Sequence, residues 1–71
     1  MPAIPPTYRE IADELTRRIE AGQYKSGTML PSYSKLADEF EVSVSTIQQA
    51  LRILRERGLT TGRPGRGVYV K

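Results

Sequence analysis

The fold is decided by residues 41–57, EVSVSTIQQALRILRER, in which apolar side chains recur at helical spacing. The spacing is i, i+3, i+4 and i+7, which marks one face of an α-helix, and the residues are Ile47, Ala50, Leu51 and Leu54. Ser43 suits the N-cap, because its hydroxyl can accept an amide hydrogen of the first turn. Gly58 suits the left-handed position that follows a helix. The sequence therefore predicts a helix over residues 44–57 whose apolar face packs into the core.

The opposite face of this predicted helix carries hydrogen-bonding side chains: Ser45, Gln48, Gln49 and Arg52. Glutamine can pair with adenine through two hydrogen bonds, and arginine can pair with guanine or hold a phosphate. Ser45 and Thr46 can bond either base edges or phosphate oxygens. A solvent-facing helix of a small helical domain would present the same face, so the helix alone leaves both interpretations open.

A shorter helix is predicted immediately upstream, over residues 33–40, with Ser32 as its cap. Its inward face consists of Leu36, Ala37 and Phe40. Only residues 41–43 separate it from the next helix, and this arrangement is typical of a helix-turn-helix. The amides and hydroxyls at its start favour a phosphate, and the residues there are Ser32, Tyr33 and Ser34. Plain capping is the alternative for Ser32, and Lys35 is either a phosphate contact or a free surface lysine.

The N-terminal part of the sequence predicts a third helix. Residues 1–6 hold three of the five prolines and are expected to be a flexible lead-in to a domain spanning residues 7–71. Thr7 and Glu10 have the spacing of a capping box, and Gly22 ends the helix. Its apolar face consists of Tyr8, Ile11, Ala12, Leu15 and Ile19. Residues 28–30 are long enough for a very short strand before Pro31.

Two β-favouring segments, residues 59–61 and 68–70, flank the basic loop GRPGRG at residues 62–67. Its glycines let the backbone approach a partner, and Arg63 and Arg66 can enter a minor groove or clamp phosphates. An ordinary hairpin turn, rich in Gly and Pro for conformational reasons, would look the same. The predicted fold class is mainly α with a small β-hairpin (α+β). It is a winged helix-turn-helix with three helices and a two- to three-stranded antiparallel wing sheet.

Charge is unevenly distributed along the 71 residues, whose formal net charge is +3. Residues 1–41 hold five basic and seven acidic side chains, whereas residues 42–71 hold six basic and one acidic, which favours a polyanion partner. The chain has no Cys and no His, which excludes disulfides, Cys/His zinc sites and thiol or histidine catalysis. We therefore predict no enzyme, no metal and no cofactor. Without a membrane-length apolar run or a signal peptide, we expect a cytoplasmic protein with no membrane partner.

Several motifs stand in a characteristic order: YREIA at 8–12, GTMLPS at 27–32, LA at 36–37, VS at 42–43, TI at 46–47, QAL at 49–51, GL at 58–59 and GRGVYV at 65–70. In this order they resemble the winged helix-turn-helix domain of the GntR family of bacterial transcription regulators. The resemblance covers residues 7–70 and implies the order helix, strand, helix, helix, strand, strand. It also implies a regulator, most simply a repressor, that binds a (pseudo)palindromic double-stranded DNA operator as a homodimer and is associated with the nucleoid when bound.

The resemblance further implies where the DNA contacts lie. They are the starts of the two helices and the wing tip: Ser32, Tyr33, Ser34; Ser43, Val44, Ser45, Thr46, Gln48; and Pro64, Gly65, with Arg63 and Arg66 nearby. The family commonly has Glu-Arg-Glu at residues 33–35, and arginine where Val44 and Gln48 stand. These departures imply a different operator and fewer phosphate contacts, which Lys35, Arg52 and the wing arginines replace in part.

Family members normally continue into a C-terminal domain that binds an effector and dimerises. The present 71 residues end one residue after the wing, so we expect no small-molecule effector site within them. The alternative function is a protein docking module without sequence-specific DNA binding, because Tyr33, Val44 and Ile53 are expected to be exposed. The wing separates the two hypotheses, because DNA binding needs Arg63 and Arg66 and docking does not.

Overall fold

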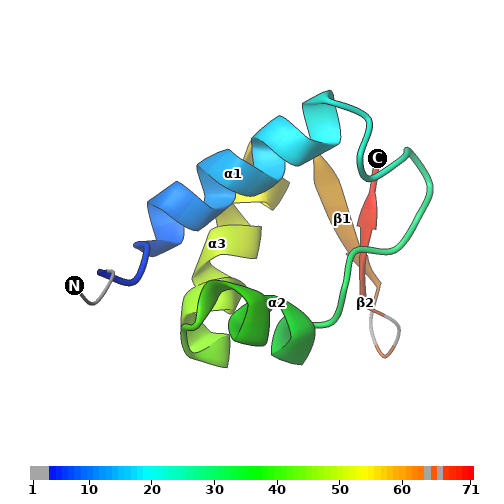
Figure 1. Cartoon of the computed structure of the whole chain (residues 1–71). Coiled ribbons are helices and arrows are strands. Elements are labelled where there is room, and N and C mark those ends of the chain that lie inside the picture. Colours follow the sequence, from blue (N-terminus) through cyan, green and yellow to red (C-terminus); the bar gives the residue numbers. More distant parts are fainter. Residues whose placement is uncertain (1–3, 64, 66) are drawn as a thin grey trace.

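The computed structural model describes residues 4–63, 65 and 67–71, which form three helices and a hairpin (Figure 1). The elements are α1 (Tyr8–Glu20), α2 (Tyr33–Phe40), α3 (Val44–Glu56), β1 (Thr60–Arg63) and β2 (Gly67–Val70). The predicted class, mainly α with a small antiparallel sheet, is confirmed. α3 ends one residue before the predicted end, with Arg57 as its C-cap.

The ends of the helices follow from short-range hydrogen bonds. The Thr7 hydroxyl accepts the Glu10 amide at 3.2 Å and the Glu10 carboxylate accepts the Thr7 amide at 2.9 Å, which confirms the capping box of α1. Gly22 ends this helix with a φ of 81°, a conformation that costs glycine nothing. Ser32 and Ser43 cap α2 and α3, each accepting the amide three residues on at 3.2 Å.

The turn between α2 and α3 is made by a residue other than glycine. Glu41 adopts the left-handed conformation, with φ 55° and ψ 47°. The next amide, that of Val42, donates to the Ala37 carbonyl at 3.0 Å and completes the helix-terminating motif. This reversal sends the chain directly into the cap of α3 at Ser43.

The apolar core lies where α1 crosses α3 and extends to α2 and the base of the sheet (Figure 1). Its buried side chains are Ile11, Ala12, Leu15, Leu30, Leu36, Ala37, Ile47, Ala50, Leu51, Leu54 and Val70. The four residues predicted to form the apolar face of α3 are all among them, which confirms that interpretation. Ile53, expected to be exposed, is instead half-buried against the core, because it follows Ala50 by three residues and borders the apolar face.

The two strands pair antiparallel, with Gly62 opposite Val68 and Arg63 opposite Gly67. The loop predicted over residues 62–67 was therefore too long, since both of its ends belong to the ladder. Gly62 has no positive φ and extends the strand as any residue could. The hairpin formed by β1, β2 and their connecting turn is called the wing below.

Residues 28–30 run beside β2 but form only an isolated bridge, between Met29 and Tyr69, in place of the predicted short strand. The Leu30 amide donates to the Val68 carbonyl at 2.8 Å. On one side of this segment the Gly27 amide, at a φ of 84°, still donates to the Val70 carbonyl at 2.8 Å. On the other side Pro31 has no amide hydrogen, so the pairing ends there. The sheet proper has two strands.

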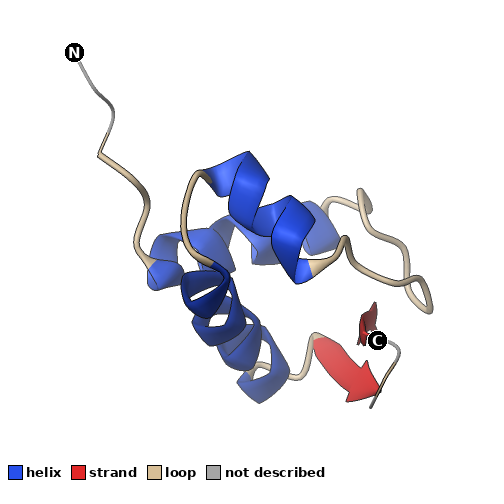
Figure 2. Cartoon of the chain, turned by 90° about the horizontal axis from the view of Figure 1, so that it is seen from below, coloured by secondary structure: helices blue, strands red, loops and turns tan. Residues whose placement is uncertain are grey.

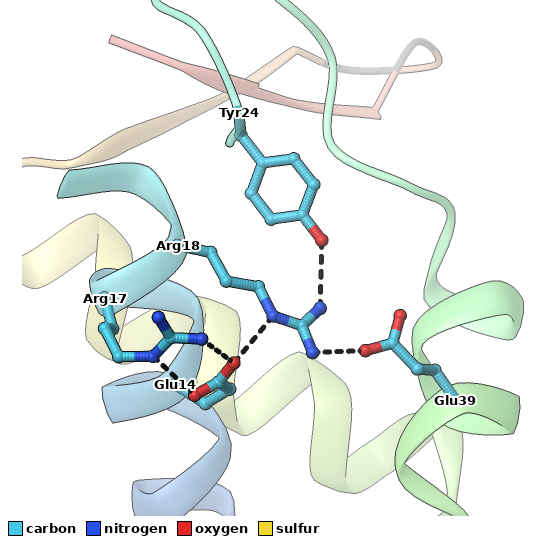
Figure 3. A network of polar contacts seen from close by, with 5 residues as sticks. All are labelled: Glu14, Arg17, Arg18, Tyr24 and Glu39. Atoms are coloured by element: carbon cyan, nitrogen blue, oxygen red, sulfur yellow. Dashed lines mark hydrogen bonds and ion pairs between the residues drawn. The ribbon is translucent and has the colours of Figure 1, made fainter. Parts of the chain in front are cut away.

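Arg18 ties α1 to α2 and to the segment between them (Figure 3). Its guanidinium pairs with the Glu39 carboxylate at 2.6 Å and with Glu14 at 2.8 Å, and it donates to the Tyr24 hydroxyl at 3.1 Å. The same group lies 5.3 Å from the centroid of the Phe40 ring, within cation–π range. The Glu39 carboxylate is the main reason that the pKa of Arg18 is raised. These contacts fix how α2 sits against α1.

Candidate nucleic-acid interface

Three parts of the chain that are separate in sequence form one face of the molecule: the start of α2, the outward side of α3, and the wing. In Figure 1, α2, the start of α3 and the turn end of the wing lie along the lower side, and Figure 2 views the molecule from below. A hollow of about 190 Å³ is lined by all three parts, with Tyr33 from α2, Gln48 and Arg52 from α3, and Gly62 from the wing. The fold thus assembles one continuous surface from the segments that the sequence predicted separately.

The starts of α2 and α3 present backbone amides to this face. In each helix the cap serine holds the third amide through its hydroxyl, and its carbonyl accepts the fourth, at 3.0 Å for Leu36 and 3.3 Å for Ile47. The first two amides of each helix have no partner within the described part of the chain. Such amides, at the positive end of a helix dipole, suit a phosphate. Capping is confirmed for Ser32, so a phosphate there would be held by the amides after it.

Most of the residues predicted to contact DNA are exposed: Ser32, Tyr33, Ser34, Lys35, Ser43, Val44, Ser45, Gln48, Gln49, Arg52, Arg63 and Gly65. Thr46 is half-buried, and its hydroxyl lies 3.0 Å from that of Ser43. Val44 is 39% exposed, although it is apolar and stands at the first position of α3. An apolar group at this place can contact the methyl group of thymine. Pro64 and Arg66, also predicted, lie outside the described residues.

Gln48 and Gln49 point to opposite flanks of α3. Gln48 lines the hollow on the wing side, whereas Gln49 lines a second hollow between α3 and the start of α1, together with Tyr8 and Arg9. Arg52 lines both hollows and therefore occupies the ridge between them. The two glutamines would therefore contact different parts of any surface that α3 approaches.

Ion pairing separates three arginines of the described residues from the other four, which are Arg9, Arg52, Arg55 and Arg63. Arg17, Arg18 and Arg57 each pair with a carboxylate, the last with Asp13 at 2.9 Å. The arginines of the candidate interface have no such partner among residues 4–63, 65 and 67–71: Arg52, Arg55 and Arg63. Their positive charge is therefore available to an anionic partner.

Sequence reasoning did not select Arg55, which lines the wing-side hollow with Tyr33 and Gln48. The signal was present, because Arg55 follows Gln48 by seven residues and so shares its side of the helix. Within the described part of the chain, no helix is long and apolar enough to cross a membrane. The same residues contain no cluster of acidic side chains that could hold a metal ion.

Residues 7–70 match the family model described as "Bacterial regulatory proteins, gntR family". The mannosyl-D-glycerate transport/metabolism system repressor MngR of Escherichia coli K12 is 46% identical over 66 residues, which are 93% of this chain and 28% of MngR. The chain spans between 13% and 28% of the length of the first curated relatives that it matches.

Solved structures of DNA complexes share the fold. The AraR DNA-binding domain in complex with operator ORX1 superposes with a TM-score of 0.88 at 28% identity, covering 96% of this chain and 82% of that chain. The same domain in complex with operator ORR3 gives a TM-score of 0.88 at 27% identity, covering all of this chain and 86% of that chain.

Proposed function

The chain belongs to the GntR family of bacterial regulatory proteins, and we propose that it binds an operator as a two-fold homodimer and represses transcription. It is a sequence-specific DNA-binding domain of a transcriptional regulator, with a winged helix-turn-helix fold. Repression is supported by the similarity to MngR, which is itself a repressor. A regulator of this kind acts at the nucleoid, and the DNA-binding unit is residues 7–71.

In the proposed complex the N-terminal part of α3 enters the major groove, where base edges are distinguishable. Gln48 pairs with adenine and Val44 contacts a thymine methyl group. The first two amides of α2 hold a backbone phosphate, and Arg63 of the wing approaches the minor groove or the backbone. The observation that carries this assignment is the wing-side hollow, which joins Tyr33, Gln48 and Gly62 on one surface with arginines that have no ion-pair partner in the described part of the chain.

Two-fold binding follows from how helix-turn-helix dimers meet DNA. Each copy reads one half-site, and the half-sites lie about one helical turn, or a multiple of it, apart on the same face of the duplex. We therefore propose a (pseudo)palindromic operator, with dimer formation at least when DNA is bound. This part of the proposal is independent of which bases α3 prefers.

The test is selection from a pool of random duplexes with the purified chain, followed by sequencing of the bound fraction. The expected result is one recurring motif with two-fold symmetry that contains adenine and thymine within each half-site. Replacing the contacted thymine by uracil removes only its methyl group, so this change should weaken binding of the wild type but not of Val44→Ala. Recovery of no motif would refute sequence-specific binding, and a motif without symmetry would refute the two-fold dimer.

A further inference from the structure

Arg55 stands where α3 meets the wing and is exposed. It lines two adjoining hollows: one of about 190 Å³ with Tyr33 and Gln48, and an open one of about 530 Å³ with Tyr33 and Arg63. The floor of the first includes Thr60, which is 2% exposed and whose hydroxyl has no hydrogen-bond partner in the described part of the chain. Arg55 thus lies beside Arg63, which likewise has no ion-pair partner among residues 4–63, 65 and 67–71.

The guanidinium of Arg55 makes no contact that holds the described part of the fold together. None of its donors makes a hydrogen bond or an ion pair with residues 4–63, 65 or 67–71. Arg57, two residues on, provides the contrast, since it donates to the Asp13 carboxylate and to the Thr16 hydroxyl, both at 2.9 Å. Two arginines that are two positions apart therefore differ in their surroundings: Arg57 pairs with Asp13 of α1, whereas Arg55 lies next to the wing.

We infer that Arg55 is a further DNA-binding residue, which clamps a backbone phosphate over the larger of these two hollows, the open one that it lines together with Arg63 of the wing. The inference rests on the proposed function. Tyr33 and Arg63 stand on the walls of the same hollow, so a phosphate seated there faces two arginines and a phenol. A guanidinium suits this role, because its planar fork can hold two phosphate oxygens at once.

The position along α3 selects a phosphate and not a base. Arg55 lies eleven residues after Val44, which corresponds to about 16 Å along the helix axis at a rise of about 1.5 Å per residue. Recognition helices contact base edges through their N-terminal residues, and in homeodomains the C-terminal end of the recognition helix contacts the DNA backbone. With Val44 at the base edges, Arg55 is carried out to the level of the sugar–phosphate backbone. The contact therefore adds affinity to every sequence and discrimination to none.

The experiment compares Arg55→Ala with Arg57→Ala, a matched pair in which the same charge is removed two positions apart. Binding is measured by fluorescence anisotropy on the duplex recovered by selection and on a duplex of unrelated sequence, at several salt concentrations. Arg55→Ala is expected to weaken both complexes by a similar factor and to reduce the salt slope by about 0.9. The ratio of the Kd of this variant to the Kd of the wild type then falls about 3.5-fold between about 50 and 200 mM salt. Arg57→Ala is expected to leave the slope unchanged.

Arg55→Lys keeps the charge and is expected to retain the slope while losing part of the affinity, and it serves as the test if the alanine variant fails to fold. Thermal unfolding of each variant separates binding from stability. A wild-type slope in Arg55→Ala, an equal change in Arg57→Ala, or a loss confined to one base pair would each overturn the phosphate clamp. If the wild type selects no motif, the proposed function itself fails, whereas a selected motif with an unchanged Arg55→Ala slope removes only the clamp.

Discussion

Glycine in place of Glu41 should make the domain more stable. Glu41 holds the left-handed conformation at the turn between α2 and α3, with φ 55° and ψ 47°. This conformation costs a residue with a β-carbon about 1–2 kcal/mol, and glycine avoids that cost. Glycine also makes the unfolded chain more flexible, which offsets about 0.4–1 kcal/mol of the gain. The net stabilisation expected for Glu41→Gly is about 0.5–1 kcal/mol, or a rise in Tm of about 2–8 °C for a domain of this size.

The assay is thermal unfolding followed by far-ultraviolet circular dichroism, with two control variants. Glu41→Ala removes the carboxylate from the C-terminal end of the helix dipole but keeps the β-carbon, so the difference in Tm between Glu41→Ala and Glu41→Gly isolates the backbone effect. Asp38→Gly places glycine inside α2, where it should cost about 0.3 kcal/mol, because Asp is already about 0.7 kcal/mol and Gly about 1 kcal/mol less favourable than Ala in a helix. A Tm for Glu41→Gly at or below that for Glu41→Ala would refute the reasoning, because no conformational strain would then have been relieved.

Two further sets of variants test the ion pairs and the two flanks of α3. Hydrogen bonds from Arg17 first, and then from Arg18, lower the pKa of Glu14 from its ordinary value of 4.5 to about 2. The stability that this carboxylate contributes is complete above pH 4.5 and is lost as the pH falls towards 2. The Tm of Glu14→Gln should therefore fall less than that of the wild type over this pH range. Gln48→Ala and Gln49→Ala should alter base preference at different positions of the half-site in repeated selections; a uniform loss across sequences would place both on phosphates.

The parts of the fold predicted from sequence are those set by contacts within a few residues. The capping box of Thr7 and Glu10 joins positions three apart, and the seam of α3 needs only helical periodicity. The turn at Glu41 was located by the two helices around it, but its left-handed conformation was not foreseen, because glycine usually marks such a site. The bridge between Met29 and Tyr69 joins segments forty residues apart and has no local signature.

Most residues of the candidate site were named from the sequence, but Arg55 and the shape of the surface were not. Helical spacing shows that Gln48 and Gln49 both face away from the core, yet it does not show which neighbour covers each flank. That depends on α1 packing along α3 and on the wing closing against the other side. Long-range packing therefore decides which outward side chains form one surface.

The two halves of α3 differ in charge, and the packing of α1 decides which of its arginines are paired. Residues 44–49 carry no charge, while the arginines of the second half, Arg52 and Arg55, are free of ion pairs within the described part of the chain. Asp13 of α1 removes Arg57 from this set, so the excess charge of residues 42–71 overstates what a DNA backbone would meet. Base reading and phosphate binding are then assigned to opposite ends of one helix. In the proposed complex, substitutions at the start of α3 change the operator that is read and leave most of the electrostatic affinity in place, because the phosphate contacts proposed for Arg52, Arg55 and the wing lie elsewhere.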